Sequence, residues 1–324
     1  MEYDKPHLTF PEQIEHLRER GLSVLDEERA ANVLRRVGYY RLSAYAYPLR
    51  LLLPENAPRT TSVQHRADQF VEGADFDLVE ALWSFDRDLR LLLMDALETI
   101  EIGLRVQISY VLGRRSTFGH LDVASLDAAA CGREGSSGRT LYEEWVDRHQ
   151  RTVHEAVSED FVRHYVEKYD ARLPIWVATE VMEFGSLVRL YGFLRDDDRG
   201  EIARSLGTLS GSVMFRWLKS ANYVRNLVAH HARVWNRRLT YSIARPSAHG
   251  PAPLVHLRRL DDAERRKVYS AAAVVAHIVR SIDGSTTWPR RFAALSQTFP
   301  TSELVSVERD MGFPSDWREG QLWL

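Results

Sequence analysis

The chain has 324 residues, of which 44% are hydrophobic and 27% charged, and its formal net charge is −2. This balance excludes a uniformly basic surface, so any nucleic-acid site must be local. The single cysteine, Cys131, excludes an intrachain disulfide and a cysteine-rich zinc site. Because the N-terminus lacks a signal-peptide pattern and no apolar run approaches the roughly 20 residues of a membrane span, we expect a soluble, cytoplasmic protein without a membrane partner.

Helix-start signals predict the first elements. Thr9 and Glu12 have the spacing of a capping box before a short helix, and Asp26 is expected to cap a second helix. The segment 38–50 that follows is dense in tyrosine and includes Arg41. Such a segment packs as an aromatic layer or stacks on nucleic-acid bases, and packing is the favoured interpretation.

The segment 76–112 carries apolar residues at helical spacing and is interrupted only by Gly103. This pattern predicts one long helix or two nearly collinear helices. Its polar residues Glu98, Glu101 and Arg105 follow at steps of three and four, so they share one face of the helix. They form either a surface ion-pair ladder or one polar wall of a functional site, and the sequence leaves both open.

The glycines of 113–140 predict a loop insertion after the long helix. Helices are then expected over 142–169, from residue 174 to 194, from 261 to 282 and from 288 onward. Three aspartates at 196–198 lie at a helix connection, where Asp caps are common, and His149 and His154 lack partners at ligand spacing. We therefore expect no metal and no cofactor. Because strand signals are almost absent from the sequence, the expected fold class is all-α.

The stretch 215–238 has neither proline nor glycine, and its apolar residues recur at steps of four, three and four. This predicts one continuous amphipathic helix packed into the core. Arg225 lies beside a polar row on the opposite side, made of Asn222, Asn226, His230, Arg233 and Arg237. Burying such groups without partners costs roughly 1–3 kcal/mol each, so the row should face a second chain, a ligand or solvent. His231 falls on the apolar side, which favours a core histidine.

The sequence from Arg225 to His230 is the strongest candidate for chemistry. An Arg and a His five positions apart form a weak motif, and Arg115 with His120 has the same spacing in a loop flanked by glycines. Only the later copy lies on a predicted core helix with an amide, Asn226, directly after the arginine.

This Arg-Asn-x3-His element resembles the signature of HEPN-type ribonucleases. Other segments resemble the bacterial abortive-infection Abi family of the AbiD/AbiF kind. They are KPHLTFPEQIEHLRERGL at 5–22, GYYRLSAY at 38–45, the long helix at 82–113, and MGFPSDW at 311–317 with LW at 322–323. The resemblance departs at Val111, where such proteins often have a histidine after the tyrosine of the long helix.

The resemblance implies a HEPN-like helical bundle at 71–240 with an N-terminal segment at 1–70 and C-terminal helices and a tail at 241–324. It implies a metal-independent RNA endonuclease toxin of phage defence or of a toxin–antitoxin system. Its composite active site would lie between the two chains of a homodimer, with an antitoxin protein or RNA as a further partner. In this chemistry the 2′-hydroxyl of RNA attacks the adjacent phosphate, an imidazole transfers protons and a guanidinium stabilises the added charge.

The candidate site residues fall into two groups. The catalytic candidates are Arg225, Asn226 and His230, and the substrate-binding candidates are Asn222, Arg233, Arg237, Arg105 and Arg41. Two other functions stay open: a non-catalytic protein that binds or senses RNA with the same polar row, and a structural interaction module in which Asn226 and His230 satisfy each other at an interface.

Overall fold

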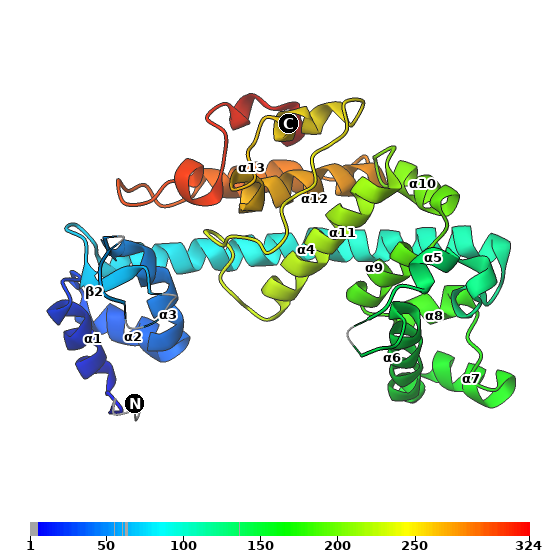
Figure 1. The fold of residues 1–324 in the computed structure, drawn as a ribbon. Helices are drawn as coiled ribbons and strands as arrows, with labels where there is room; N and C mark the ends of the chain where they lie inside the picture. The colour runs from blue at the N-terminus through cyan, green and yellow to red at the C-terminus, as the bar shows by residue number, and fades with distance from the viewer. Residues whose placement is uncertain (1–5, 55, 60, 62–63, 136) are drawn as a thin grey trace. The chain divides into compact units, whose positions relative to one another are not determined.

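The structure is a computed structural model that describes residues 6–54, 56–59, 61, 64–135 and 137–324. The described chain is mainly helical, as predicted, with one short antiparallel pairing of β1 (Arg50–Leu52) and β2 (Arg66–Phe70) (Figure 1). It divides into two compact units, residues 1–90 with 294–310 and residues 91–293 with 311–324. These boundaries do not coincide with the three segments expected from the sequence.

The first unit begins with α1 (Phe10–Glu19), α2 (Glu27–Val37) and α3 (Tyr39–Ala46). The Glu12 carboxylate accepts the Thr9 backbone N–H at 2.7 Å, and Asp26 accepts the Arg29 backbone N–H at 2.9 Å. These bonds satisfy N–H groups that a helix start leaves without partners. Both predicted N-terminal caps are therefore present.

Two of the segments quoted for the resemblance meet inside the first unit. Tyr45 of α3 donates its hydroxyl to Asp86 at 2.7 Å, and Asp86 lies on α4 (Phe76–Arg115). Arg90, one turn further along α4, donates to the Tyr45 hydroxyl at 2.9 Å and to Asp86. All three side chains are buried, whereas Tyr40 is 90% exposed. The tyrosine-rich segment thus supplies part of the core through Tyr45 and leaves another ring in solvent.

The second unit contains the rest of α4 and most of the remaining helices. They are α5 (Ala128–Cys131), α6 (Leu141–Glu155), α7 (Asp160–Tyr169), α8 (Ile175–Val181), α9 (Phe184–Phe193), α10 (Asp196–Ser205), α11 (Gly211–Ala229), α12 (Val268–Ile282) and α13 (Trp288–Gln297). The predicted long helix is one continuous helix, α4. The structure also gives a reason for the glycine at position 103. A Cβ at Gly103 would lie 2.7 Å from Ile282 of α12, so the glycine permits close packing of the two helices.

The glycines of α9 also have a packing role. A Cβ at Gly185 would lie 3.4 Å from Asn222 of α11, and a Cβ at Gly192 would lie 2.9 Å from Phe215 of the same helix. The two glycines are seven residues apart on α9, and their partners are seven residues apart on α11 in the reverse order. The two helices therefore pack antiparallel over two turns. This close approach, together with contacts to α10 and α12, fixes the position of α11 within the second unit.

The C-terminal motif of the sequence is part of the core of the second unit. Phe292 stacks on Trp323 with ring centroids 5.0 Å apart, and Phe313 meets Trp317 edge to face at 5.0 Å. Trp288 donates its indole N–H to the carbonyl of Leu92 at 2.6 Å, which ties the cluster to α4. The closing aromatic residues therefore stabilise the unit by packing.

Candidate functional site

Helix α11 ends at Ala229, so the prediction of one helix up to Arg238 was wrong. The backbone N–H of His231 bonds to the carbonyl of Val228 at 3.1 Å, and that of Ala232 bonds to the carbonyl of Leu227 at 2.9 Å. These two bonds, around a left-handed residue, form a Schellman motif that closes the helix. His230 is the C-cap of α11 and leads directly into the turn.

His231 occupies the left-handed position of this motif, with φ at +54°. Its side chain is exposed, so the prediction of a core histidine was wrong. The apolar spacing behind that prediction breaks down because the chain leaves the helix one residue earlier. The apolar stripe is confirmed as far as the helix extends, since Trp217, Val224 and Val228 are buried, and Trp235 is buried after the turn.

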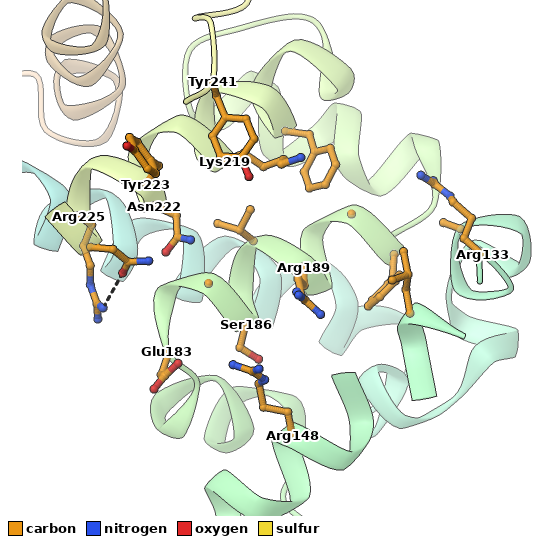
Figure 2. Close-up of a pocket in the computed structure, with 18 residues that line it drawn as sticks. Arg133, Arg148, Glu183, Ser186, Arg189, Lys219, Asn222, Tyr223, Arg225 and Tyr241 are labelled. Carbon is orange, nitrogen blue, oxygen red and sulfur yellow. Dashed lines mark hydrogen bonds between the residues drawn. The ribbon is translucent and has the colours of Figure 1, made fainter. Parts of the chain in front are cut away.

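Arg225 is the motif residue with the most defined surroundings. Its guanidinium lies 3.6 Å from a carboxylate oxygen of Glu101 on α4. It also donates to the Asn226 side-chain carbonyl at 3.3 Å (Figure 2). The same Glu101 accepts from Arg105 at 2.7 Å. One carboxylate thus lies between two guanidiniums, so the polar ladder of α4 reaches the motif. Glu98 of that ladder is exposed and has no ion pair within the described chain.

The other predicted residues are placed differently. Asn226 and His230 are exposed, and Asn222 lies one turn before Asn226 on α11. Arg105 donates to the carbonyls of Glu180 and Met182 at 2.8 and 2.9 Å, in addition to its pair with Glu101. The remaining candidates lie outside α11: Arg233 and Arg237 follow in the segment after the turn, and Arg41 is exposed on α3 in the first unit.

The other Arg-x4-His pair, Arg115 with His120, has a structural role. Arg115 donates to both carboxylate oxygens of Asp198 at 2.9 and 3.1 Å, which ties the end of α4 to α10. His120 is completely buried. Val111, where the resemblance departs, is 2% exposed, so a side chain at that position contributes to the core. The two copies therefore share a spacing and differ in exposure.

A pocket of about 540 Å³ adjoins Arg225 and Asn226. Figure 2 shows it between α9 and α11, with Arg225 at one end and Arg133 at the other. Five cations line it: Arg133, Arg148, Arg189, Lys219 and Arg225. Glu183 is the single acid among the described residues of its wall, and His230 is not part of that wall. The pocket is therefore strongly positive, although the whole chain is slightly negative.

Aromatic rings form the wall nearest to α11. The Lys219 ammonium lies 5.0 Å from the centroid of Tyr241 and 5.8 Å from that of Phe215. Tyr223 meets Tyr241 edge to face at 6.0 Å. Burial raises the pKa of Tyr223, but hydrogen bonds from Thr240 and Arg237 outweigh it, so the pKa is lowered. Arg237 is thereby linked to the pocket through this tyrosine.

Most residues that line the pocket were not predicted from the sequence. One signal was present: Arg189 is the single charged residue of α9, whose other side chains are apolar or small, and it is exposed. A lone cation on such a helix indicates a polar surface at that point. Tyr241 and Arg133 gave no comparable signal, because each lies in an irregular segment where no helical spacing relates it to α11.

In the part of the chain that the structure describes, no group of three or more His, Cys, Asp or Glu side chains could hold a metal ion. None of the described helices combines the length and the apolar character needed to cross a membrane. Comparisons with curated proteins and with solved structures found no match. A family model described as Abi-like protein matches residues 32–236, which include the tyrosine-rich segment, α4 and the motif of α11. Since this match covers more than half of the sequence, the chain belongs to the Abi-like protein family.

Proposed function

We propose that this Abi-like protein is a metal-independent RNA endonuclease that acts as a toxin in abortive infection, with a HEPN-type site shared by two copies of the chain. The observation that carries the proposal is the end of α11, where Arg225 and Asn226 line a strongly positive pocket and the exposed His230 follows one turn after Asn226. An arginine, an amide and an imidazole beside concentrated positive charge suit the handling of a phosphodiester.

Each side chain has a role that its chemistry supports. The imidazole of His230 would take the proton of the attacking 2′-hydroxyl or give one to the leaving oxygen. Arg225 would pair with the phosphate oxygens and stabilise the charge that builds up in the transition state. Asn226 accepts a hydrogen bond from Arg225 and so helps to orient it. The cyclic phosphate product of such an attack requires RNA, because DNA lacks the 2′-hydroxyl.

Glu101 would act as a positioning residue. It lies between Arg225 and Arg105, and its own side chain is 14% exposed. A partly buried carboxylate restricts the guanidinium of Arg225, which is 30% exposed, and leaves its other N–H groups available to a phosphate. The group of two arginines and one glutamate keeps a net positive charge, as an anion-binding site requires.

The face of α4 beside Glu101 supports the pairing of two copies. Ile102, Val106 and Tyr110 follow one another at steps of four residues and are 52%, 56% and 63% exposed. Such steps place them on one face, and exposed apolar residues grouped in this way are typical of interaction surfaces. A second copy bound there would lie next to the residues that hold Arg225.

This pairing predicts the mass of the protein in solution. The wild-type chain is expected to sediment at twice its mass of 37.3 kDa, and Val106→Asp to sediment as a monomer, because a charge on the apolar face opposes the contact. The exposed Leu209 lies outside α4, and Leu209→Asp serves as the matched control. A wild-type monomer that cleaves RNA, measured by analytical ultracentrifugation and cleavage on the same sample, would contradict a shared site.

The catalytic assignment predicts that His230→Ala cleaves an unstructured RNA at least about 100-fold more slowly than wild type, because general acid–base catalysis contributes about 10²–10⁴-fold. His231→Asn is the matched control. Asparagine tolerates the left-handed conformation, so this variant should retain the turn and cleave like wild type. Equal cleavage by wild type and His230→Ala would refute the assignment. RNA affinity without cleavage by any preparation would instead favour a non-catalytic RNA-binding protein.

A further inference from the structure

The positive pocket between α9 and α11 has features that the cleavage chemistry does not use. We propose that it binds one unpaired nucleotide of a single-stranded RNA, next to the bond held by Arg225, with its base on the aromatic wall and its phosphates on the cations. The inference rests on the proposed function for the identity of the ligand as RNA. It adds that the substrate is single-stranded where it enters the site.

The charge of the pocket indicates an anionic ligand. Arg133, Arg148, Arg189 and Lys219 form no ion pair with any carboxylate in the described part of the chain. They come from three helices and an irregular segment, so no single surface pattern places them together. Figure 2 shows the side chains of Arg148 and Arg189 close to the same side of the cavity. Converging cations without acidic partners favour a ligand with more than one negative charge, such as two successive phosphates.

The aromatic wall indicates a flat ring in the ligand. Tyr241 is 42% exposed, and its ring lies against the Lys219 ammonium and near the Tyr223 ring. A base can stack on such a ring in any sequence, because every base has a π-face. Inside a duplex both faces of a base are covered by stacking on its neighbours, so the wall favours an unpaired strand over a duplex.

Asn222 supplies a polar contact inside the pocket. Its side-chain carbonyl oxygen is buried and has no hydrogen-bond partner among the described residues. A buried acceptor without a partner costs about 1–3 kcal/mol, which a donor on the ligand would recover once the amide turns toward the pocket that Asn222 lines. The exocyclic amino group of a base is such a donor, and Asn222 stands one turn before Asn226, between the aromatic wall and Arg225.

The size of the pocket fits the proposal. A volume of about 540 Å³ lies within the range of small-molecule sites, which suits one nucleotide and excludes a folded domain. Because Arg225 and Asn226 form one end of the wall, a strand whose base fills the pocket would carry its backbone directly past the motif. The pocket would then fix the register of the strand relative to His230.

The test measures binding without cleavage. In the His230→Ala background, fluorescence anisotropy is measured with a labelled, unstructured RNA decamer. Arg189→Gln together with Lys219→Gln is expected to weaken binding at least tenfold and to reduce the slope of log affinity against log salt by about 1.4, since each phosphate contact on a single strand contributes about 0.7. Tyr241→Ala is expected to weaken binding about tenfold through the lost stacking.

Arg216→Gln is the matched control, because Arg216 is exposed on the same helix and is not among the lining residues. It should bind like the parent. All substituted residues are exposed or half-exposed, and unchanged thermal melts would show that the fold is retained. Equal affinity of the parent, the double variant and Tyr241→Ala would overturn the proposal.

Two further probes distinguish a single strand from a duplex and from a free mononucleotide. A duplex of the same sequence should bind more weakly than the single strand, and adenosine 5′-monophosphate should compete only at much higher concentration. A duplex that binds equally well, or a mononucleotide that binds as tightly as the decamer, would overturn the proposal. The proposed function can fail independently: wild type that never cleaves, with binding still lost in the pocket variants, would refute cleavage and retain the pocket.

Discussion

Asp86→Ala is expected to lower the free energy of unfolding of the first unit by about 3–5 kcal/mol, because it leaves a buried arginine without its counter-charge. Arg90 is 7% exposed and donates to both Asp86 and Tyr45. Burial, and then the Asp86 carboxylate, raise the pKa of Tyr45, so its hydroxyl stays a proton donor. The loss should appear as a lower urea midpoint, followed by circular dichroism.

The same segment provides the matched control. Asp88 is exposed and pairs with Arg87 at the surface at 3.1 Å, so Asp88→Ala should change stability by less than about 0.5 kcal/mol. Tyr45→Phe removes one hydrogen-bonding group and retains the ring, with an expected cost of about 1–2 kcal/mol. Replacing both charges, by Asp86→Leu and Arg90→Met, should be far milder than Asp86→Ala alone. Equal midpoints for Asp86→Ala and Asp88→Ala would contradict a buried ion pair.

The buried side of α11 could be predicted because apolar periodicity is a local property of the sequence. Trp217, Val224 and Val228 follow helical spacing, and all three are buried. The end of the helix could not be predicted in this way. A Schellman motif usually places glycine at its left-handed position, and here His231 occupies it. Without the glycine signal, the apolar spacing extended the prediction beyond the actual end.

The contacts of Arg225 could likewise be predicted only where they are local in the sequence. The polar ladder of α4 was visible in the sequence, but its contact with α11 joins Glu101 and Arg225, which are far apart along the chain. Such a contact follows from helix packing, and the packing depends on where small residues permit close approach. Gly185 and Gly192 are spaced like Phe215 and Asn222, so a matched pattern of small and large residues was present. This match is recognisable only once the structure has paired the two helices, and the cations of the pocket are brought together by that pairing.

Acid is expected to destabilise the second unit through two buried histidines, His120 and His149, whose rings meet edge to face at 5.4 Å. His149 also stacks on Trp145 at 5.4 Å. Neither ring nitrogen of His120 has a hydrogen-bond partner among the described residues, and neither has the Nδ1 of His149. Burial lowers the pKa of His120 to about 3 and that of His149 to about 4. Both imidazoles are therefore neutral in the folded chain.

The sign of the pH dependence follows from these values. In the unfolded chain both histidines bind protons below the ordinary pKa of about 6.5, whereas the folded chain binds none until about pH 4. The stability from keeping them neutral is thus fully present above pH 7 and is lost as the pH falls below 6.5. A pH of 5 lies about 1.5 units below the ordinary pKa. The free energy of unfolding at pH 5 is therefore lower by about 2 kcal/mol per histidine, and by about 4 kcal/mol for the pair.

A double variant isolates this contribution from the other titrating groups. His120→Leu with His149→Phe retains apolar volume and should be close to wild type in stability at pH 7.5, because the lost nitrogens have no partners to leave unsatisfied. Between pH 7.5 and pH 5 it should lose about 4 kcal/mol less than wild type in urea unfolding. His154→Gln, an exposed change on the same helix, should follow wild type at every pH. His256 and His277, whose pKa values burial also lowers, act equally in all three proteins, so parallel curves for wild type and the double variant would contradict the assignment.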